Sequence, residues 1–293
     1  MGFGSIALFF FLIYASIQWF PKRGQAVLMG IANSIGMVGW IALNRFTQYV
    51  NGLFGIELSI CVLLILTLYM GMIIYSLLKK GPKNKVPFSR AFILVLKDKV
   101  CWCFGLVSIG FYAATFIFAT TWGYSFFMEV YGLSKETTDF FSNLVFLGLG
   151  IGGPCVGYLS DKFSRRKVFI VALNVIALSS IGGMLYFSPL PVVLLGVLSF
   201  VIGVCSSGYL LLYTLAIDYN HPKIRGATAL FISLMLLIGS VVVESQLEFP
   251  FLFLLLATTG LFALRINDPP PEMEQSKETL EKLFSIGEKI SNS

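Results

Sequence analysis

The residues best suited to chemistry form one charged stretch, "GYLSDKFSRRKV", at positions 157–168 between two long apolar segments. It combines Gly157 and the carboxylate of Asp161 with four bases, Lys162, Arg165, Arg166 and Lys167. An acid beside several bases can form ion pairs that break when helices move, and a glycine lets neighbouring helices approach closely. The alternative interpretation is a plain anchor that holds a loop on the positively charged side of a membrane.

The composition of the chain indicates an integral membrane protein. Of its 293 residues, 57% are hydrophobic and 12% are charged, and the mean hydropathy is +0.84. Soluble domains carry roughly 25% charged residues. The net charge of +6 lies in short links between apolar runs, so we expect no nucleic-acid partner. The five cysteines lack zinc-ligand spacing, and we expect no metal and no cofactor.

Long apolar segments predict an all-α fold, a polytopic membrane bundle of about nine helices. A bilayer core is ~30 Å thick and needs ~20 apolar residues per helix, and backbone in lipid must satisfy its own hydrogen bonds. The expected spans are 1–20, 25–44, 56–78, 103–127, 139–160, 168–187, 190–213, 226–243 and 249–266.

The polar segments divide these spans into units. We expect the remnant of a first bundle at 1–78, a cytoplasmic linker at 79–102, a six-helix bundle at 103–266 and a cytoplasmic tail at 267–293. Within the linker, helical spacing of apolar residues predicts a short helix at the membrane surface. Its expected apolar face contains Phe88, Phe92, Val95 and Leu96.

Lysine and arginine predict the orientation. Nineteen of the 21 basic residues lie in alternate links and in the tail, and only Arg45 and Lys135 lie on the other side. Because basic loops stay in the cytoplasm, the C-terminus is predicted to be cytoplasmic and Met1, nine spans earlier, to face outward.

A short repeat suggests two halves. "FPKRGQA" begins at Phe20 and "HPKIRGATA" at His221, and six expected spans separate the two copies. If each copy follows the fourth span of a six-span half, three spans are absent before Met1. The chain is then expected to be the last nine spans of a twelve-span protein.

The charged stretch resembles the signature link of the major facilitator superfamily. Gly157, Asp161, Lys162, Arg165 and Arg166 match that pattern, while Ser164 replaces its usual glycine. The links "WFPKRG" and "PKIRG" resemble the family's links after the fourth and tenth spans. The stretch "WGYSFFMEVYGLSKE" with "GGPCVGYLSD" resembles bacterial nutrient importers, including phagosomal transporters, and implies the inner membrane.

The resemblance implies a conformational latch that closes the cytoplasmic side. Asp161 is expected to face the positive N-terminus of the helix that opens at Arg225 and Gly226. Arg165 is expected to pair with an acid at a nearby helix end, and Asp218 is the best candidate. The expected latch residues are Gly157, Asp161, Lys162, Arg165, Arg166, Asp218, Arg225 and Gly226.

Polar and aromatic residues inside spans are candidates for a path along which a small-molecule solute moves. They are Asn33, Ser34, Tyr112, Thr115, Trp122, Asn143, Ser206 and Tyr209, with Ser207 and Ser233 as further polar positions. Asn33, Tyr112 and Tyr209 lead this set, and helix packing is the alternative role for each. "GLGIGGP" at 148–154 predicts close helix packing and a kink at Pro154.

Other function classes fit less well. The chain has no nucleotide-binding G-x-x-x-x-G-K-[ST] motif of a pump, and one histidine without an intramembrane acid cluster argues against an enzyme. No carboxylate lies in mid-membrane, which fits either a uniporter or a proton-coupled symporter whose coupling residue lies outside this chain. We expect secondary or facilitated transport across a lipid bilayer by alternating access. The alternative is an inactive or scaffold remnant of such a transporter.

Overall fold

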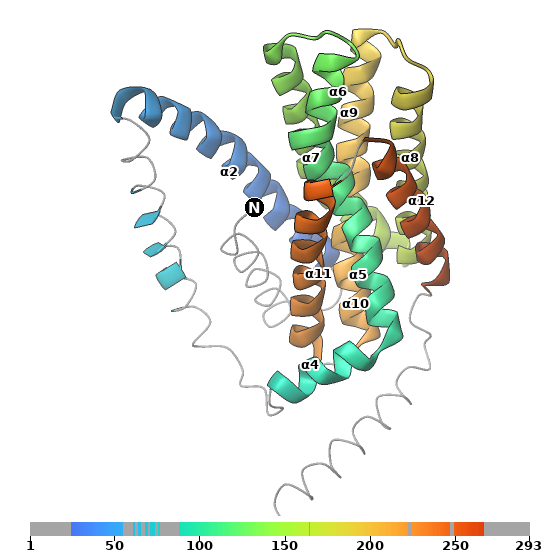
Figure 1. Cartoon of the computed structure of the whole chain (residues 1–293). Coiled ribbons are helices and arrows are strands. Elements are labelled where there is room, and N and C mark those ends of the chain that lie inside the picture. The colour runs from blue at the N-terminus through green and yellow to red at the C-terminus, as the bar shows by residue number, and fades with distance from the viewer. Residues whose placement is uncertain are drawn as a thin grey trace, which may run out of the picture.

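The structure, a computed structural model, describes residues 25–54, scattered positions between 61 and 76, 88–163, 165–221, 224–246 and 249–266 (Figure 1). The expected span 1–20, the first part of the expected linker and the expected tail at 267–293 lie outside these residues. Most of the expected span 56–78 also lies outside them.

Each described element is a helix. In chain order they are α2 (Gln25–Phe54), α4 (Phe88–Lys97), α5 (Lys99–Tyr112), the π-helix η1 (Ala113–Trp122), α6 (Gly123–Glu129), α7 (Lys135–Phe163), α8 (Arg166–Tyr186), α9 (Val192–Ser206), α10 (Gly208–Tyr219), α11 (Arg225–Gln246) and α12 (Phe249–Arg265).

Four helical stretches among the described residues are long and apolar enough to cross a bilayer. They are Lys99–Glu129, Lys135–Phe163, Arg166–Tyr186 and Val192–Tyr219. The first joins α5, η1 and α6, and the last joins α9 and α10 across a turn at Ser207. With α11 and α12 beside them, they make an all-α membrane helical bundle, as the sequence predicted (Figure 1).

Helix α2 is longer than its expected span of 25–44. It continues to Phe54 through the polar stretch that begins at Asn44. Polar residues end an apolar window, but they do not end a helix, and no proline interrupts this segment. In Figure 1, α2 lies against the bundle near its beginning and leans away from it towards its end.

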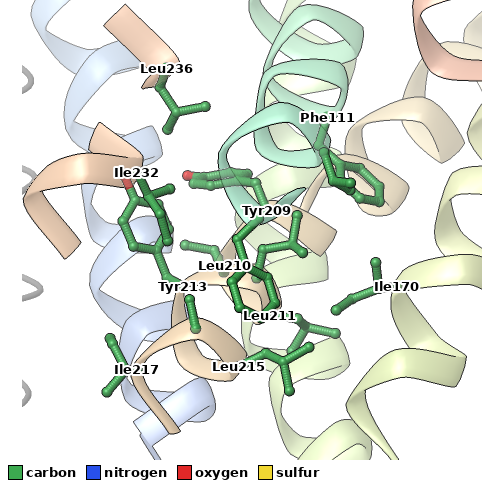
Figure 2. Packing of buried hydrophobic residues seen from close by; sticks show 14 of the residues in the cluster. Phe111, Ile170, Tyr209, Leu210, Leu211, Tyr213, Leu215, Ile217, Ile232 and Leu236 are labelled. Carbon is green, nitrogen blue, oxygen red and sulfur yellow. The ribbon is translucent and has the colours of Figure 1, made fainter. Parts of the chain in front are cut away.

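The core of the bundle surrounds α10. Every residue from Gly208 to Ile217 is buried, and α10 packs against α5, α8 and α11. Figure 2 shows Tyr213 and its neighbours in this core with Phe111 of α5 and Ile170 of α8. Because α10 is enclosed on all sides, polar groups that it carries must find partners inside the protein.

The short helix expected in the linker is present as α4. Its buried residues are Ala91 and Val95, which belong to the same apolar cluster as Phe231 of α11. Of the other residues expected on its apolar face, Phe92 is half-buried and Leu96 is 40% exposed. The expected position of this helix at the membrane surface stays a prediction.

Candidate functional site

Three charged residues meet where α7 and α10 end and α8 begins. The Nη2 atom of Arg166 lies 3.1 Å from Oδ1 of Asp161, and Nη1 of Arg166 donates to Oδ2 of Asp218. The three side chains are mostly buried, with exposed fractions of 13%, 13% and 20% for Arg166, Asp161 and Asp218. Charge-assisted bonds of this kind are roughly twice as strong as neutral ones. This ion cluster therefore fixes the ends of three helices to one another.

The partner of Asp218 is Arg166 and not Arg165, which corrects the expected pair. Arg165 precedes α8 with non-helical backbone angles (φ −127°, ψ 64°) and is exposed, whereas Arg166 is the first helical residue. The helix therefore directs the side chain of Arg166 back towards the ends of α7 and α10. Lys162, also expected in the latch, is exposed, and its Nζ atom lies 6.0 Å from the ring centre of Tyr158 in the same helix.

Arg225 extends the charged region to the start of α11. It is only 8% exposed, its Nε donates to the carbonyl of Ile217 at 3.1 Å, and Asp218 is near enough to interact with its charge. Three buried atoms here have no hydrogen-bond partner among the described residues: Oδ2 of Asp161, Oδ1 of Asp218 and Nη2 of Arg225. The contact expected between Asp161 and the N-terminus of α11 stays a prediction.

Small residues let α2 and α7 approach closely near the ion cluster. A Cβ atom on Gly157 would lie 2.7 Å from the carbonyl oxygen of Ala26, and one on Gly153 would lie 3.1 Å from Cα of Gly30. The sequence predicted such an approach at Gly157. We call this contact the small-residue seam. Its members are Ala26, Gly30 and Ser34 of α2 and Gly150, Gly153 and Gly157 of α7.

At the end of the seam away from Gly157, Ser34 donates a hydrogen bond to a carbonyl that Pro154 leaves without a helical donor. Pro154 has no N–H, so within α7 it cannot donate to the carbonyl of Gly150 as a helical residue would. The hydroxyl of Ser34 donates to that carbonyl from α2 at 2.5 Å, and it also lies 2.9 Å from the carbonyl of Gly30 in its own helix. Ser34 thus joins two helices here, and its place on a solute path stays a prediction.

Asn33 and Tyr209, expected along the solute path, contact each other. The Tyr209 hydroxyl donates to Oδ1 of Asn33 at 2.7 Å, which links α10 to α2. Tyr209 is 4% exposed and Asn33 is 5% exposed, and Nδ2 of Asn33 has no partner within the described part of the chain. Tyr112 belongs to the same buried cluster as Tyr209 and stacks on Phe116 with ring centres 4.6 Å apart. The three leading residues of the sequence prediction therefore lie in one region.

The other path candidates are more dispersed. The hydroxyls of Thr115 and Ser206 donate to carbonyls four residues earlier in the chain, those of Phe111 and Ile202. Trp122 is buried at the end of η1, and Asn143 is exposed on α7.

Sequence reasoning overlooked Asn174. This side chain of α8 is 2% exposed and packs on Gly260 of α12, and its Nδ2 atom has no partner among the residues that the structure describes. The signal that could have identified it is an asparagine inside an apolar run.

A comparison of the sequence with protein-family models identifies the family of this chain. Residues 1–244 match the Major Facilitator Superfamily, a range that contains α2, the ion cluster and the polar pair of Asn33 and Tyr209. A comparison with curated proteins found no match, and the narrower resemblance to nutrient importers stays a prediction. Since the match covers most of its length, the chain belongs to the major facilitator superfamily, whose members transport solutes across membranes.

Proposed function

We propose that this chain carries a small solute by alternating access, as a secondary or facilitated transporter, and that the ion cluster is a latch on its cytoplasmic end. The observation that carries the proposal is the position of the small-residue seam. Gly157 is one helical turn from Asp161 in α7, so the seam and the ion cluster lie at the same end of that helix. One helix thus joins a charged cluster to a tight contact between the two expected bundles.

The chemistry of the ion cluster supports a switching role. A buried charge without its full set of hydrogen bonds is costly, and the cluster with Arg225 contains three such atoms. Arg166 therefore stabilises the observed conformation through its ion pairs with Asp161 and Asp218. The three atoms of Asp161, Asp218 and Arg225 can still bond to other partners. When α2 separates from α7 at the seam, we propose that these groups exchange partners and admit water.

The polar pair of Asn33 and Tyr209 supports a solute contact between the expected bundles. Its hydrogen bond joins α2 to α10, and the amide hydrogens of Asn33, which have no partner among the described residues, can donate to an acceptor on a solute. The aromatic rings of Tyr112 and Phe116 provide an apolar wall in the same buried cluster as Tyr209. Among the described residues, these contacts are uncharged, which favours a neutral solute.

The charge distribution supports the proposed placement in the membrane. The ion cluster and α4 both belong to sequence segments rich in lysine and arginine, which the charge pattern assigns to one side of the membrane. We propose that this end and the C-terminus are cytoplasmic and that the membrane is a bacterial inner membrane. Proton coupling is compatible with this proposal, and so is uniport.

The replacement Asp161→Asn tests the latch. It removes the charge that pairs with Arg166, and charge-assisted bonds contribute about 1.5–3 kcal/mol, so we expect solute uptake to fall at least about tenfold. The measurement is a solute-uptake screen in proteoliposomes with the full chain, followed by the variant on each solute that is taken up. Asp139→Asn is the matched control, because Asp139 is exposed at the opposite end of the same helix.

Two results would count against this function. Equal uptake by Asp161→Asn and the unsubstituted chain would refute the latch while leaving transport intact. Failure of a folded, inserted chain to move any solute would instead favour the scaffold alternative.

A further inference from the structure

Helix α4 is too short to cross a bilayer and lies across the end of the bundle (Figure 1). Its ten residues span ~15 Å, about half the thickness of a bilayer core. Ala91 and Val95 attach it to the apolar cluster that contains Phe231 of α11. Within the described part of the chain, the helix therefore has one side against the protein and one exposed side.

The free side carries large apolar side chains. Ile93 is 50% exposed and Leu96 is 40% exposed, and Trp102, at the start of α5, is 42% exposed. The Nε1 atom of Trp102 donates to the carbonyl of Leu96 at 2.9 Å, and its ring meets the edge of Phe231 with centres 5.2 Å apart. Tryptophan is enriched where a membrane meets water, because its ring is apolar and its N–H is polar. This group is thus suited to the boundary between lipid headgroups and acyl chains.

Three exposed cations adjoin this apolar group. Arg90 and Lys97 are two helical turns apart on the same side of α4, and Lys99 follows directly in α5. The one acid between positions 88 and 102 is Asp98, and its Oδ1 accepts a hydrogen bond from the backbone N–H of Val100 at 2.9 Å. Its carboxylate is therefore engaged by the first turn of α5.

From this arrangement we propose that α4 is a membrane-surface helix whose free side binds the headgroups of acidic lipids. Ile93, Leu96 and Trp102 would enter the acyl boundary, while Arg90, Lys97 and Lys99 would contact the anionic phosphates. The charges are complementary, and each basic residue near an anionic leaflet strengthens its attraction. A zwitterionic bilayer would accept the apolar side chains equally well, but it has no net negative charge and would attract the three cations less strongly.

Amide hydrogen exchange of the full chain in lipid nanodiscs tests the proposal. The two preparations contain phosphatidylcholine alone or phosphatidylcholine mixed with phosphatidylglycerol. We expect exchange in peptides covering 88–97 to be about tenfold slower with phosphatidylglycerol at low salt, and high salt should remove most of this difference. The triple variant Arg90→Gln, Lys97→Gln and Lys99→Gln should lose the difference.

The control variant is Lys135→Gln, which neutralises an exposed lysine at the opposite end of the bundle and should keep the difference. Unchanged exchange in α9 shows that the triple variant is folded. Equal protection of α4 in both kinds of nanodisc would overturn the proposal. So would protection by phosphatidylglycerol that survives in the triple variant. Protection that requires an added soluble acidic protein would assign the surface to that partner instead.

Discussion

At the scale of single residues, two tyrosines one turn apart in α10 have different partners. Tyr209 donates to Asn33 of α2 at 2.7 Å, whereas the hydroxyls of Tyr213 and Ser233 of α11 lie 2.9 Å apart. Both rings are buried. Only the first bond joins the two expected bundles, and the second stays within one of them. Comparing substitutions of Tyr209 and Tyr213 can therefore distinguish an effect on transport from an effect on stability.

We predict that Tyr209→Phe lowers solute uptake at least about fivefold, while Tyr213→Phe leaves it within about twofold. Each variant removes one buried hydrogen bond, which contributes about 1 kcal/mol to stability, so their unfolding midpoints should fall by similar amounts. Uptake in proteoliposomes and thermal unfolding in detergent measure the two effects. A similar loss of uptake in both variants would contradict the proposed role of the Asn33 and Tyr209 contact.

The residues of the charged link could be predicted from the sequence, but their pairing could not. The spacing of Gly157, Asp161 and Arg166 and the proximity of an acid before "PKIRG" identified the participants. Which arginine reaches Asp218 depends on where the helix begins after the break between α7 and α8. A shift of one residue turns a helical side chain by about 100°. Arg166 therefore has the position that the sequence prediction gave to Arg165.

At the scale of elements, the glycines of α7 serve two different neighbours. Gly148 and Gly152 face backbone of α9, whereas Gly153 and Gly157 face backbone of α2. The run "GLGIGGP" predicted close packing, which is confirmed, but a periodic run cannot say which helix approaches which face. Lipid provides no hydrophobic drive between helices, so such close contacts contribute much of their association. The π-helical backbone of η1 had no signal in the apolar sequence of that span.

We predict that Gly157→Ala weakens the small-residue seam. The added methyl group would lie 2.7 Å from the Ala26 carbonyl oxygen, so α2 must shift, and overpacking of this kind costs typically 1–3 kcal/mol. Amide exchange in α2 should become faster, and the unfolding midpoint should fall. Gly183→Ala is the matched control in α8, where a Cβ atom would meet nothing within 4 Å. It should leave both measurements unchanged or slightly improve stability.

Graded substitution strengthens this test of the seam. At Gly150 a Cβ atom would meet Cβ of Met37 at 3.6 Å, an ordinary contact, so Gly150→Ala should have a smaller effect than Gly157→Ala. An equal effect at positions 150, 157 and 183 would show that helix propensity, and not the approach of α2, determines the response.

At the scale of the whole molecule, the two ends of the bundle are expected to differ in their content of basic residues. Nineteen of its 21 lysines and arginines belong to links that the sequence assigns to one side. Helix α7 is long enough to extend from one end to the other, because its 29 residues span ~43 Å, which is enough to cross a bilayer. Lys135 begins this helix and Lys162 lies in its last turn, and both are exposed. The two lysines therefore report on opposite sides of the membrane.

We predict that a membrane-impermeant maleimide labels Lys135→Cys in intact cells and labels Lys162→Cys only after the cells are permeabilised. The physical reason is that the four bases from Lys162 to Lys167 resist transfer across the membrane during insertion. The unsubstituted chain measures the background from native cysteines, of which Cys101 and Cys205 are buried. The reverse labelling pattern would place the ion cluster outside, so that the latch would close the opposite entrance. Labelling of both variants in intact cells would mean that the chain inserts in both orientations, and then the charge asymmetry would not determine its topology.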